Sequence, residues 1–468
     1  MENANSVQFR RLGDQEGAIQ QSHHHPADDH MNDCKRYFKV VAPLIFVFVA
    51  VMLAISLVTL LFIKNDKGKD SDSSSGELPK ILHQFSSVDF TNYCGNSYTV
   101  ENNVITGLKA YKNKLYVTVP RWKRGVPSTL NVVAQTGDID PLTSHRKSTP
   151  TVRSASTNES IVCMSILRAG VVAVYATRSG DPSALQYVQS MEIDPRGWMW
   201  IIDVGRLYIA TPTPDNSSPP KIIIYDLNTN QTVKSYVFPN EVAPYNSSFL
   251  NDIVVDVDRN WAYISGVSTR INPSLAFIID SVNYGTQNFT TPSDGIALTP
   301  DGNELYYCAL HSLDLFVVPT SALMNFSLTW QQISQEVVKV IEKDSPSDGL
   351  AMTSNGDLIY GGLTTSAVYR INRISSMQPP VSADAEMACA ILFRLVTAAE
   401  AYSNSVTMQW VDTFAFDDEE GSILWTTNQL FRYFTTPTNF VSSANNNYRI
   451  PMRIFSWKTG DRSYMFGK

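Results

Sequence analysis

Six polar residues recur at one position of a repeated sequence pattern, and three of them are carboxylates. They are Thr106, Gln189, Asn251, Asp294, Asp348 and Asp412. Oxygen-bearing side chains gathered in a ring can hold a divalent cation or the ammonium group of a small ligand. A carboxyl group of raised pKa can also serve as a catalytic base, for which Asp294, Asp348 and Asp412 are the candidates. The alternative is that these side chains hydrogen-bond to backbone groups where strands begin.

The repeated pattern predicts the element that positions these residues. Each copy has a polar residue, alternating apolar positions, a turn and a second, aromatic-rich strand. The apolar anchors stand two residues after the polar ones and are spaced 43 to 83 residues apart: Leu108, Met191, Ile253, Ile296, Leu350 and Phe414. Blades of a β-propeller need about 40–50 residues each. We therefore expect an all-β, six-bladed β-propeller, closed by a strand from the segment KILHQFSSVDF that begins at Lys80.

The N-terminal part of the chain has a different character. Residues 40–63 carry no charge, and a helix over them would be about 36 Å long, enough to cross a bilayer. We expect residues 1–39 to form a cytoplasmic tail, 40–63 a transmembrane signal anchor, 64–79 a flexible stalk and 80–468 the propeller. The alternative, a buried core helix at 40–63, fits less well because the segment is apolar all round.

Possible modification sites follow this segment and favour a type II topology, with the propeller extracellular or lumenal. Six N-x-S/T sequons occur, at Asn158, Asn216, Asn230, Asn246, Asn288 and Asn325. Four cysteines, Cys94, Cys163, Cys308 and Cys389, also follow it, an even number that suits two disulfides in an oxidising compartment. Of the three connectivities that four cysteines allow, we expect Cys94–Cys163 and Cys308–Cys389.

Composition and motifs exclude several classes of function. The net charge of −7 argues against nucleic acid as a partner. The sequence lacks G-x-S-x-G, H-E-x-x-H and P-loop motifs. The basic cluster Arg121, Lys123 and Arg124 surrounds Trp122 and is either a solvated loop or an anion site. The Ala-rich stretch from Ala383 to Tyr402 predicts a helix in an insertion.

Several segments resemble the Yellow/major royal jelly protein family. The most specific is LYVTVPRWKRGVPSTLNVV, Leu115 to Val133. Others follow in the family's order: GWMWIIDVGR from Gly197, FLNDIVVDV from Phe249, GIALTPDGNELYY from Gly295 and ILWTTNQLFRYF from Ile423. The resemblance spans nearly all of residues 80–435 and implies the same six-bladed propeller.

The resemblance also implies a range of functions. Some members bind biogenic amines in the channel, and a last-blade Thr with an Asn about fifteen residues later contacts the ligand. Thr413 and Asn428 match that spacing, with Leu430 where those members have an aromatic residue. We therefore expect a protein that binds small aromatic amines or catechols, without a cofactor unless a divalent cation occupies the channel. The alternatives are a dopachrome-tautomerase-like or metal-dependent lactonase/strictosidine-synthase-like enzyme, and a glycosylated surface recognition protein whose protein partners the sequence does not name.

Overall fold

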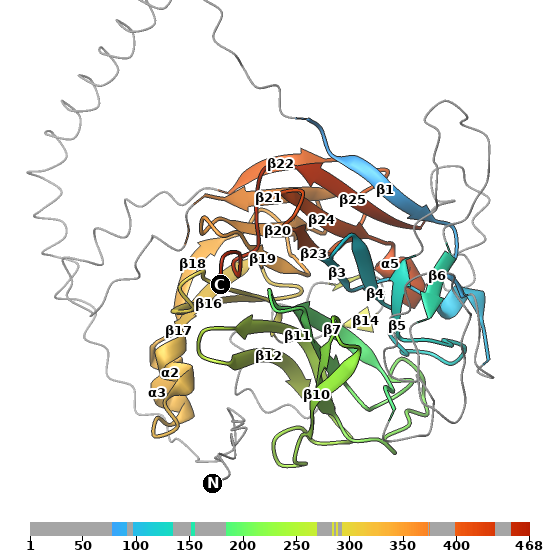
Figure 1. The fold of residues 1–468 in the computed structure, drawn as a ribbon, viewed down its shortest axis with the longest axis horizontal. Coiled ribbons are helices and arrows are strands. Elements are labelled where there is room, and N and C mark those ends of the chain that lie inside the picture. Colours follow the sequence, from blue (N-terminus) through green and yellow to red (C-terminus); the bar gives the residue numbers. More distant parts are fainter. Residues whose placement is uncertain are drawn as a thin grey trace, which may run out of the picture. The chain divides into compact units, whose positions relative to one another are not determined.

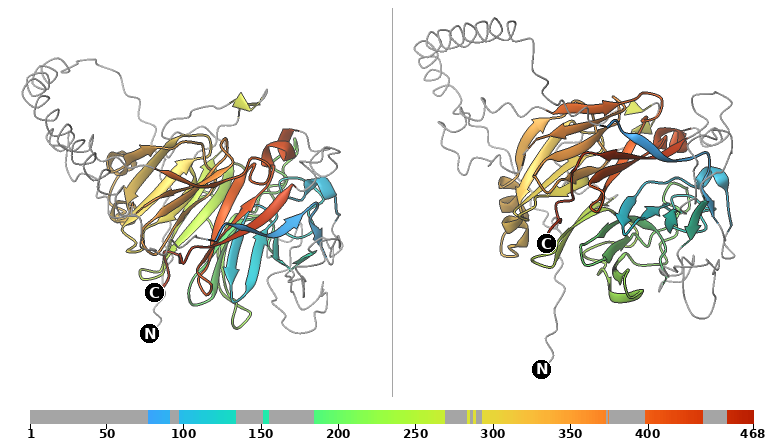
Figure 2. Two further views of the ribbon diagram at one scale, coloured as in Figure 1. Left: turned by 90° about the horizontal axis from the view of Figure 1, so that it is seen from above. Right: turned by 45° about the horizontal axis from the view of Figure 1, so that its top comes forward.

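The described part of the chain forms a β-propeller. The computed structural model describes residues 77–90, 97–133, 151–154, 184–268, 283–284, 287–288, 293–372, 374, 398–435 and 451–468. All of them belong to one compact unit. Figure 1 shows their sheets arranged around a centre, and Figure 2 shows the sheets packed side by side from two further directions.

The first three sheets lie in the N-terminal half of the ring. Blade 1 has the strand order β3-β4-β5-β6-β2, blade 2 has β7-β8-β9-β10, and blade 3 is the hairpin β11-β12. Their strands are β2 (Asp89–Phe90), β3 (Leu108–Tyr111), β4 (Lys114–Thr118), β5 (Leu130–Val133), β6 (Thr151–Ser154), β7 (Val188–Ile193), β8 (Trp198–Asp203), β9 (Lys221–Asp226), β10 (Gln231–Val237), β11 (Ser248–Asp256) and β12 (Trp261–Ser268). A 3-10 turn, η1 (Val100–Asn102), precedes β3.

The remaining sheets complete the ring. Blades 4, 5 and 6 have the orders β15-β16-β17-β18, β19-β20-β21-β22 and β23-β24-β25-β1. Their strands are β15 (Ser293–Leu298), β16 (Glu304–Ala309), β17 (Asp314–Pro319), β18 (Val338–Glu342), β19 (Leu350–Met352), β20 (Leu358–Gly362), β21 (Ala367–Ile371), β22 (Ala399–Ser403), β23 (Val411–Asp417), β24 (Ser422–Thr427), β25 (Met452–Lys458) and β1 (Lys80–Phe85). Outside these blades lie β13 (Asn283–Tyr284), β14 (Gln287–Asn288), α2 (Thr320–Met324), α3 (Trp330–Gln335) and α5 (Leu430–Thr435).

The innermost strands form a closed circle. In order they are β3, β7, β11, β15, β19 and β23, each beside the next, with β23 beside β3. All six apolar anchors of the repeat lie on these strands and are buried. The propeller prediction is therefore confirmed. Five of the positions hold sheets of four or five strands, whereas the described residues of blade 3 supply only β11 and β12.

The ring closes where the sequence predicts. β1 pairs antiparallel with β25, from Lys80 opposite Ser456 to Phe85 opposite Met452. Figure 1 shows this blue strand beside the red strands of blade 6. Segments from the two ends of the propeller thus share one sheet, which joins blade 6 to the chain that enters blade 1.

The C-terminal segment, Asp461–Lys468, connects three blades. Tyr464 donates its hydroxyl to the carbonyl of Val255 and accepts from the Val255 N–H, at 3.1 and 2.8 Å. Its own N–H donates to the carbonyl of Met352. Ser463 bonds to Asp418 through its N–H and its hydroxyl, at 2.6 and 2.8 Å. The segment therefore ties β11, β19 and the β23–β24 turn together, and Figure 1 places the C-terminal end beside β19.

One prediction about local structure, the helix over Ala383–Tyr402, is corrected. Ala399–Ser403 is strand β22, which pairs with β21, so the predicted helix cannot extend over Ala399–Tyr402. Pairing with a neighbouring strand outweighs the helix propensity of alanine there. The remaining residues of that stretch, except Ala398, lie outside the described ranges.

The predicted Cys308–Cys389 disulfide stays a prediction, since the structure describes only Cys308 of this pair. Cys308 is buried on β16 without a disulfide partner among the described residues, and its Sγ lies 3.3 Å from the hydroxyl oxygen of Ser347. An even cysteine count does not reveal that one thiol points into the propeller core. Cys94, Cys163 and Cys389 lie outside the described residues.

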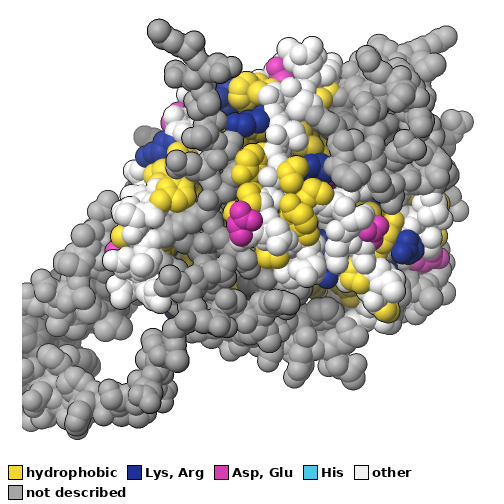
Figure 3. Space-filling model, turned by 90° about the horizontal axis from the view of Figure 1, so that it is seen from below, with side chains coloured by type: hydrophobic (Ala, Val, Ile, Leu, Met, Phe, Trp, Pro, Cys, Tyr) yellow, Lys and Arg dark blue, Asp and Glu magenta, His cyan; other side chains and the backbone are white. Residues whose placement is uncertain are grey.

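The predicted anchor is not covered by the structure. Within the described ranges, no helix is both long enough and apolar enough to cross a bilayer. Residues 1–76, which include the predicted tail, anchor and most of the stalk, lie outside those ranges. On the side of the propeller shown in Figure 3, charged side chains of both signs lie between apolar ones.

Candidate ligand-binding channel

The six polar residues of the repeat, hereafter the polar ring, lie at the start of the inner strands, and several are joined directly. Gln189 Nε2 donates to Asn251 Oδ1 at 3.0 Å, and Asn251 Nδ2 donates to Asp294 Oδ1. Tyr187 donates its hydroxyl to Gln189 Oε1 at 2.6 Å. A hydrogen-bonded chain thus runs across blades 2, 3 and 4.

The other three members are held by residues within or beside their own blades. Asn428 Nδ2 donates to Asp412 Oδ2 at 2.6 Å, and Trp410 Nε1 donates to Asp348 Oδ2 at 2.7 Å. The hydroxyls of Thr106 and Thr118 are 3.3 Å apart. Each carboxylate of the ring therefore accepts at least one side-chain hydrogen bond that fixes its orientation.

β-Bulges occur at four positions of the polar ring. The pairing register shifts between Val188 and Ser190 in β7, and between Leu250 and Ile253 in β11. Similar shifts flank Asp294 in β15 and Asp412 in β23. A bulge changes the direction of a side chain relative to the regular pleat. The alternating pattern of the sequence does not reveal these shifts.

Glycine after two of the carboxylates allows the inner strands to approach closely. The Gly349 N–H donates to the carbonyl of Asp412 at 2.7 Å, and a Cβ on Gly349 would lie 2.5 Å from that carbonyl oxygen. A Cβ on Gly295 would likewise collide with the carbonyl oxygen of Asp348. The Asp-Gly pairs of the repeat therefore bring β15, β19 and β23 together at the level of the carboxylates.

The carboxylates of the polar ring affect one another's protonation. Burial raises the pKa of Asp348 to about 7. Burial and the charge of Asp348 hold the pKa values of Asp294 and Asp412 well above the ordinary range. Since like charges in one site disfavour the ionised forms, these carboxyl groups retain protons that a bound cation would displace.

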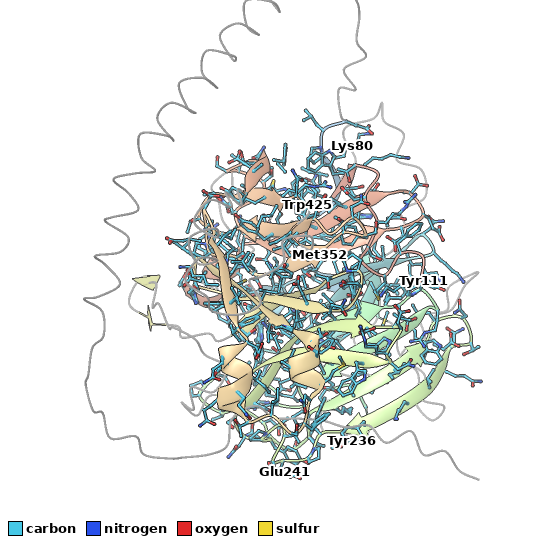
Figure 4. The ribbon with its side chains drawn as sticks, turned by 90° about the vertical axis from the view of Figure 1, so that its left-hand side faces the viewer. Lys80, Tyr111, Tyr236, Glu241, Met352 and Trp425 are labelled. Atoms are coloured by element: carbon cyan, nitrogen blue, oxygen red, sulfur yellow. The ribbon has the colours of Figure 1, made fainter. Side chains whose placement is uncertain are left out.

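A cavity of about 300 Å³ lies among the inner strands, and its wall includes Asp252 and Thr413, which directly follow two polar-ring members, but none of the polar-ring residues themselves. All six inner strands contribute to its wall, and residues 463–467 of the C-terminal segment line it as well. Tyr111 and Met352, both labelled in Figure 4, belong to the wall. Its volume lies at the lower end of the range of about 300–1,000 Å³ typical of small-molecule sites.

The charged residues of the cavity wall were missed by the sequence analysis, among them Lys109, Glu192 and Asp252. Lys109 and Glu192 form an ion pair with Nζ and Oε2 3.0 Å apart, and Asp252 accepts from the Ser190 hydroxyl at 2.9 Å. Burial raises the pKa values of Glu192 and Asp252, and the charge of Lys109 opposes both shifts. Their place in the repeat was an available signal, because Lys109 and Glu192 follow their polar-ring members by three residues and Asp252 follows Asn251 directly.

The three positions suggested by the family resemblance differ in where they lie. Thr413 lines the cavity. Asn428 is 1% exposed and bonds to Asp412, to the carbonyl of Ile105 and to the N–H of Leu430. Leu430 is buried at the first position of α5. Asn428 therefore orients Asp412, and direct ligand contact by Asn428 and Leu430 stays a prediction.

The basic cluster is divided between the interior and the surface. Arg121 is buried and donates to the carbonyls of Gln186, Val126 and Pro127. Lys123 donates to the carbonyl of Tyr433 at 2.6 Å and lies 3.8 Å from the centre of that ring. Trp122 is buried and Arg124 is exposed. The cluster thus contacts α5 through Lys123, and only Arg124 of its three basic residues is exposed to solvent.

A metal site was the other expectation for the channel. Among the side chains that the structure describes, no three or more His, Cys, Asp or Glu groups are arranged to hold a metal ion. The divalent cation stays a prediction.

The fold and the channel define a β-propeller with a carboxyl-rich central cavity. The family model for the major royal jelly proteins matches residues 186–271 and 276–382, which include the inner strands of blades 3, 4 and 5. This match confirms the resemblance of the chain to the Yellow/major royal jelly protein family.

Curated relatives come from insects. Protein yellow of Drosophila melanogaster is 24% identical over 303 residues, which are 58% of this chain and 51% of that protein. The dopaminechrome tautomerase of Drosophila melanogaster is 24% identical over 295 residues, 56% of this chain and 59% of the enzyme. The chain thus spans between half and three fifths of the length of these two relatives. Among solved structures, the luciferin-regenerating enzyme is 11% identical with a TM-score of 0.40, covering 82% of this chain and 97% of the enzyme.

Proposed function

We propose that this protein binds small aromatic amines or catechols in its central channel. The supporting observation is the group of carboxylates behind the cavity wall: Asp294, Asp348 and Asp412 have raised pKa values, and Thr413, directly after Asp412, lines the cavity. An ammonium group placed among them compensates the repulsion between the carboxylates and replaces the protons they retain. The site therefore favours a cation over a neutral molecule of the same shape.

The rest of the cavity suits an aromatic ring. Tyr111, Phe414, Phe416 and Tyr464 belong to its wall. Aromatic side chains offer apolar surface to a ligand ring and attract an ammonium group through their π faces. A cation with an aromatic body therefore satisfies both parts of the site.

Calorimetric titration of the full-length protein in mild detergent with dopamine, tyramine and serotonin tests the proposal. We expect micromolar or tighter binding to at least one amine, and at least a tenfold loss of affinity in Asp348→Asn. The matched control is Asp344→Asn, because Asp344 is exposed in the loop before Asp348. Absence of binding to every amine, or unchanged affinity in Asp348→Asn, would reject the carboxylate ring as a cation site.

A catalytic alternative is favoured by Asp252 and Glu192. Carboxyl groups of raised pKa beside a cavity are suited to move protons near neutral pH. One relative is a dopaminechrome tautomerase, and tautomerisation requires only such transfers. Conversion of dopachrome or dopaminechrome by the purified protein, reduced at least tenfold in Asp252→Asn, would support the enzyme. A rate no higher than that of the uncatalysed reaction would remove it.

We also propose that residues 40–63 anchor the protein and that the propeller is extracellular or lumenal. Four sequon residues whose side chains are described, Asn216, Asn230, Asn246 and Asn325, are exposed, which a glycosylated propeller requires. Endoglycosidase treatment of protein from a eukaryotic cell should reduce its apparent mass. An unchanged mass would contradict lumenal exposure of these sites.

A further inference from the structure

The ion pair between Lys109 and Glu192 is a second polar feature of the cavity, separate from the polar ring. The two residues come from the adjacent inner strands β3 and β7, and both line the cavity. Their side chains are 20% and 7% exposed. Burying an ion pair removes water from both charges. Polar groups of a ligand in the cavity can therefore form the hydrogen bonds to Lys109 and Glu192 that water no longer forms.

The position of the pair along the channel follows from the strands. Lys109 and Glu192 each lie three residues beyond their polar-ring members, Thr106 and Gln189. At about 3.3 Å per residue, the pair lies roughly 10 Å further along the channel than the ring. Phe414, two residues beyond Asp412, lies between the two levels and belongs to the cavity wall. The cavity wall thus carries the ion pair at one level, and Asp252 and Thr413, which directly follow two polar-ring members, at the other.

The hydrogen-bonding capacity of the pair indicates what it can bind. A lysine ammonium has three N–H donors, and Glu192 Oε2 accepts one of them. Glu192 Oε1 accepts from the N–H of Ile193 at 2.9 Å, and each carboxylate oxygen has a second lone pair. An unused donor therefore lies beside an acceptor, an arrangement that fits a hydroxyl group, which both accepts and donates.

We propose that Lys109 and Glu192 bind a ring hydroxyl of the ligand, and that the channel thereby selects hydroxylated aryl-ethylamines over amines with a bare ring. This inference rests on the proposed function, because the ammonium group of the same ligand lies at the Asp252 and Thr413 end of the cavity, next to the polar ring. The side chains of the channel wall reach the ligand from the side. The ligand therefore lies along the channel axis, with one end at each of the two levels. A hydroxylated ring that carries a two-carbon ammonium chain has a length comparable to the separation of these two levels.

Comparison of two amines in three proteins tests the inference. Dopamine carries ring hydroxyls and 2-phenylethylamine does not, while both carry the same ammonium chain. For the full-length protein we expect dopamine to bind at least about tenfold more tightly, the effect of one hydrogen bond to a charged group. In Glu192→Gln and in Lys109→Met, the ratio of the two affinities should fall below about three.

Glu342→Gln is the matched control, because Glu342 is exposed on the outer strand β18, and it should keep the full ratio. Thermal unfolding of each variant confirms that it is folded, and the isosteric Glu192→Gln is the less disruptive change. Equal affinities for the two amines in the unmodified protein would overturn the inference while leaving the proposed function intact. A ratio that persists in both channel variants would also overturn it. Failure of both amines to bind the unmodified protein would instead reject the proposed function, and this inference with it.

Discussion

The indole N–H of Trp410 donates a 2.7 Å hydrogen bond to the carboxylate of Asp348. Trp410 directly precedes β23, whereas Asp348 precedes β19, so the bond joins blades 5 and 6 at the level of the polar ring. It holds Asp348 in the position from which its charge raises the pKa values of Asp294 and Asp412. This contact thus connects the packing of the blades with the electrostatics of the channel.

Replacing Asp348 by Asn should change how stability depends on pH. The folded protein raises the pKa of Asp348 from 3.8 to about 7, so the folded state holds this proton more tightly than the unfolded chain. Its contribution to stability is fully present below pH 3.8 and is lost as the pH rises through 7. The loss is at most about 1.4 kcal/mol per pH unit.

We therefore expect the melting temperature of ligand-free protein to fall less steeply between pH 5 and 8 in Asp348→Asn. The asparagine Oδ1 can still accept from Trp410, which limits the structural disturbance. Thermal unfolding measured across this range checks the prediction, with Asp344→Asn as the control. An identical pH dependence in the variant and the unmodified protein would show that Asp348 titrates normally.

Gly349→Ala should disturb the carboxylate ring through packing. The added Cβ would meet the carbonyl of Asp412, and the hydrogen bond from the Gly349 N–H to that carbonyl would stretch or break. Forcing an extra carbon into a packed interior typically costs about 1–3 kcal/mol. Chemical denaturation provides the measurement. Gly460→Ala is a control free of collision, because a Cβ at Gly460 meets nothing within 4 Å, although its positive φ of 81° adds some backbone strain.

The hydroxyl of Tyr464 should contribute to stability through the backbone of β11. Tyr464→Phe leaves the Val255 N–H without its partner, and an unsatisfied buried donor costs about 1–3 kcal/mol. The free energy of unfolding should fall by that amount, and the C-terminal segment should become more sensitive to limited proteolysis. Tyr245→Phe, in the loop before β11, is the comparison. Unchanged protease sensitivity in Tyr464→Phe would indicate that the segment is held by its other contacts.

Cys308 should behave as a protected thiol. It is fully buried, so an alkylating reagent should modify it only after denaturation, without prior reduction. Peptide mass spectrometry of samples labelled before and after denaturation provides the test. A peptide crosslinked between Cys308 and Cys389 would contradict the free thiol.

The propeller and the place of its polar ring were predictable because both depend on local patterns. Each inner strand alternates apolar and polar positions, and Asp-Gly pairs mark two of them, so Asp294 and Asp348 could be assigned to the ring. The closing strand was predictable because an apolar segment preceded the first repeat. Local sequence is sufficient for features of this kind.

Long-range packing explains what was missed. The ion pair between Lys109 and Glu192 depends on which inner strands are neighbours, and the two residues are 83 positions apart. The segment that carries Tyr464 belongs to no repeat, and its partners lie on other blades. The burial of the Cys308 thiol depends on the direction of one side chain in β16. Of these relationships only the ion pair leaves a trace in the repeat, because both of its residues stand three positions after a polar-ring member.

Proton release on amine binding tests the central claim most directly. The full-length protein is titrated with dopamine at pH 7 in two buffers that differ in ionisation enthalpy, and the difference in heat gives the protons exchanged. Because an ammonium group should displace protons from Asp348 and its neighbours, we predict net release and an affinity that rises from pH 6 to pH 8. Binding without proton release, and with equal affinity at both pH values, would contradict a carboxylate ring that binds the cation.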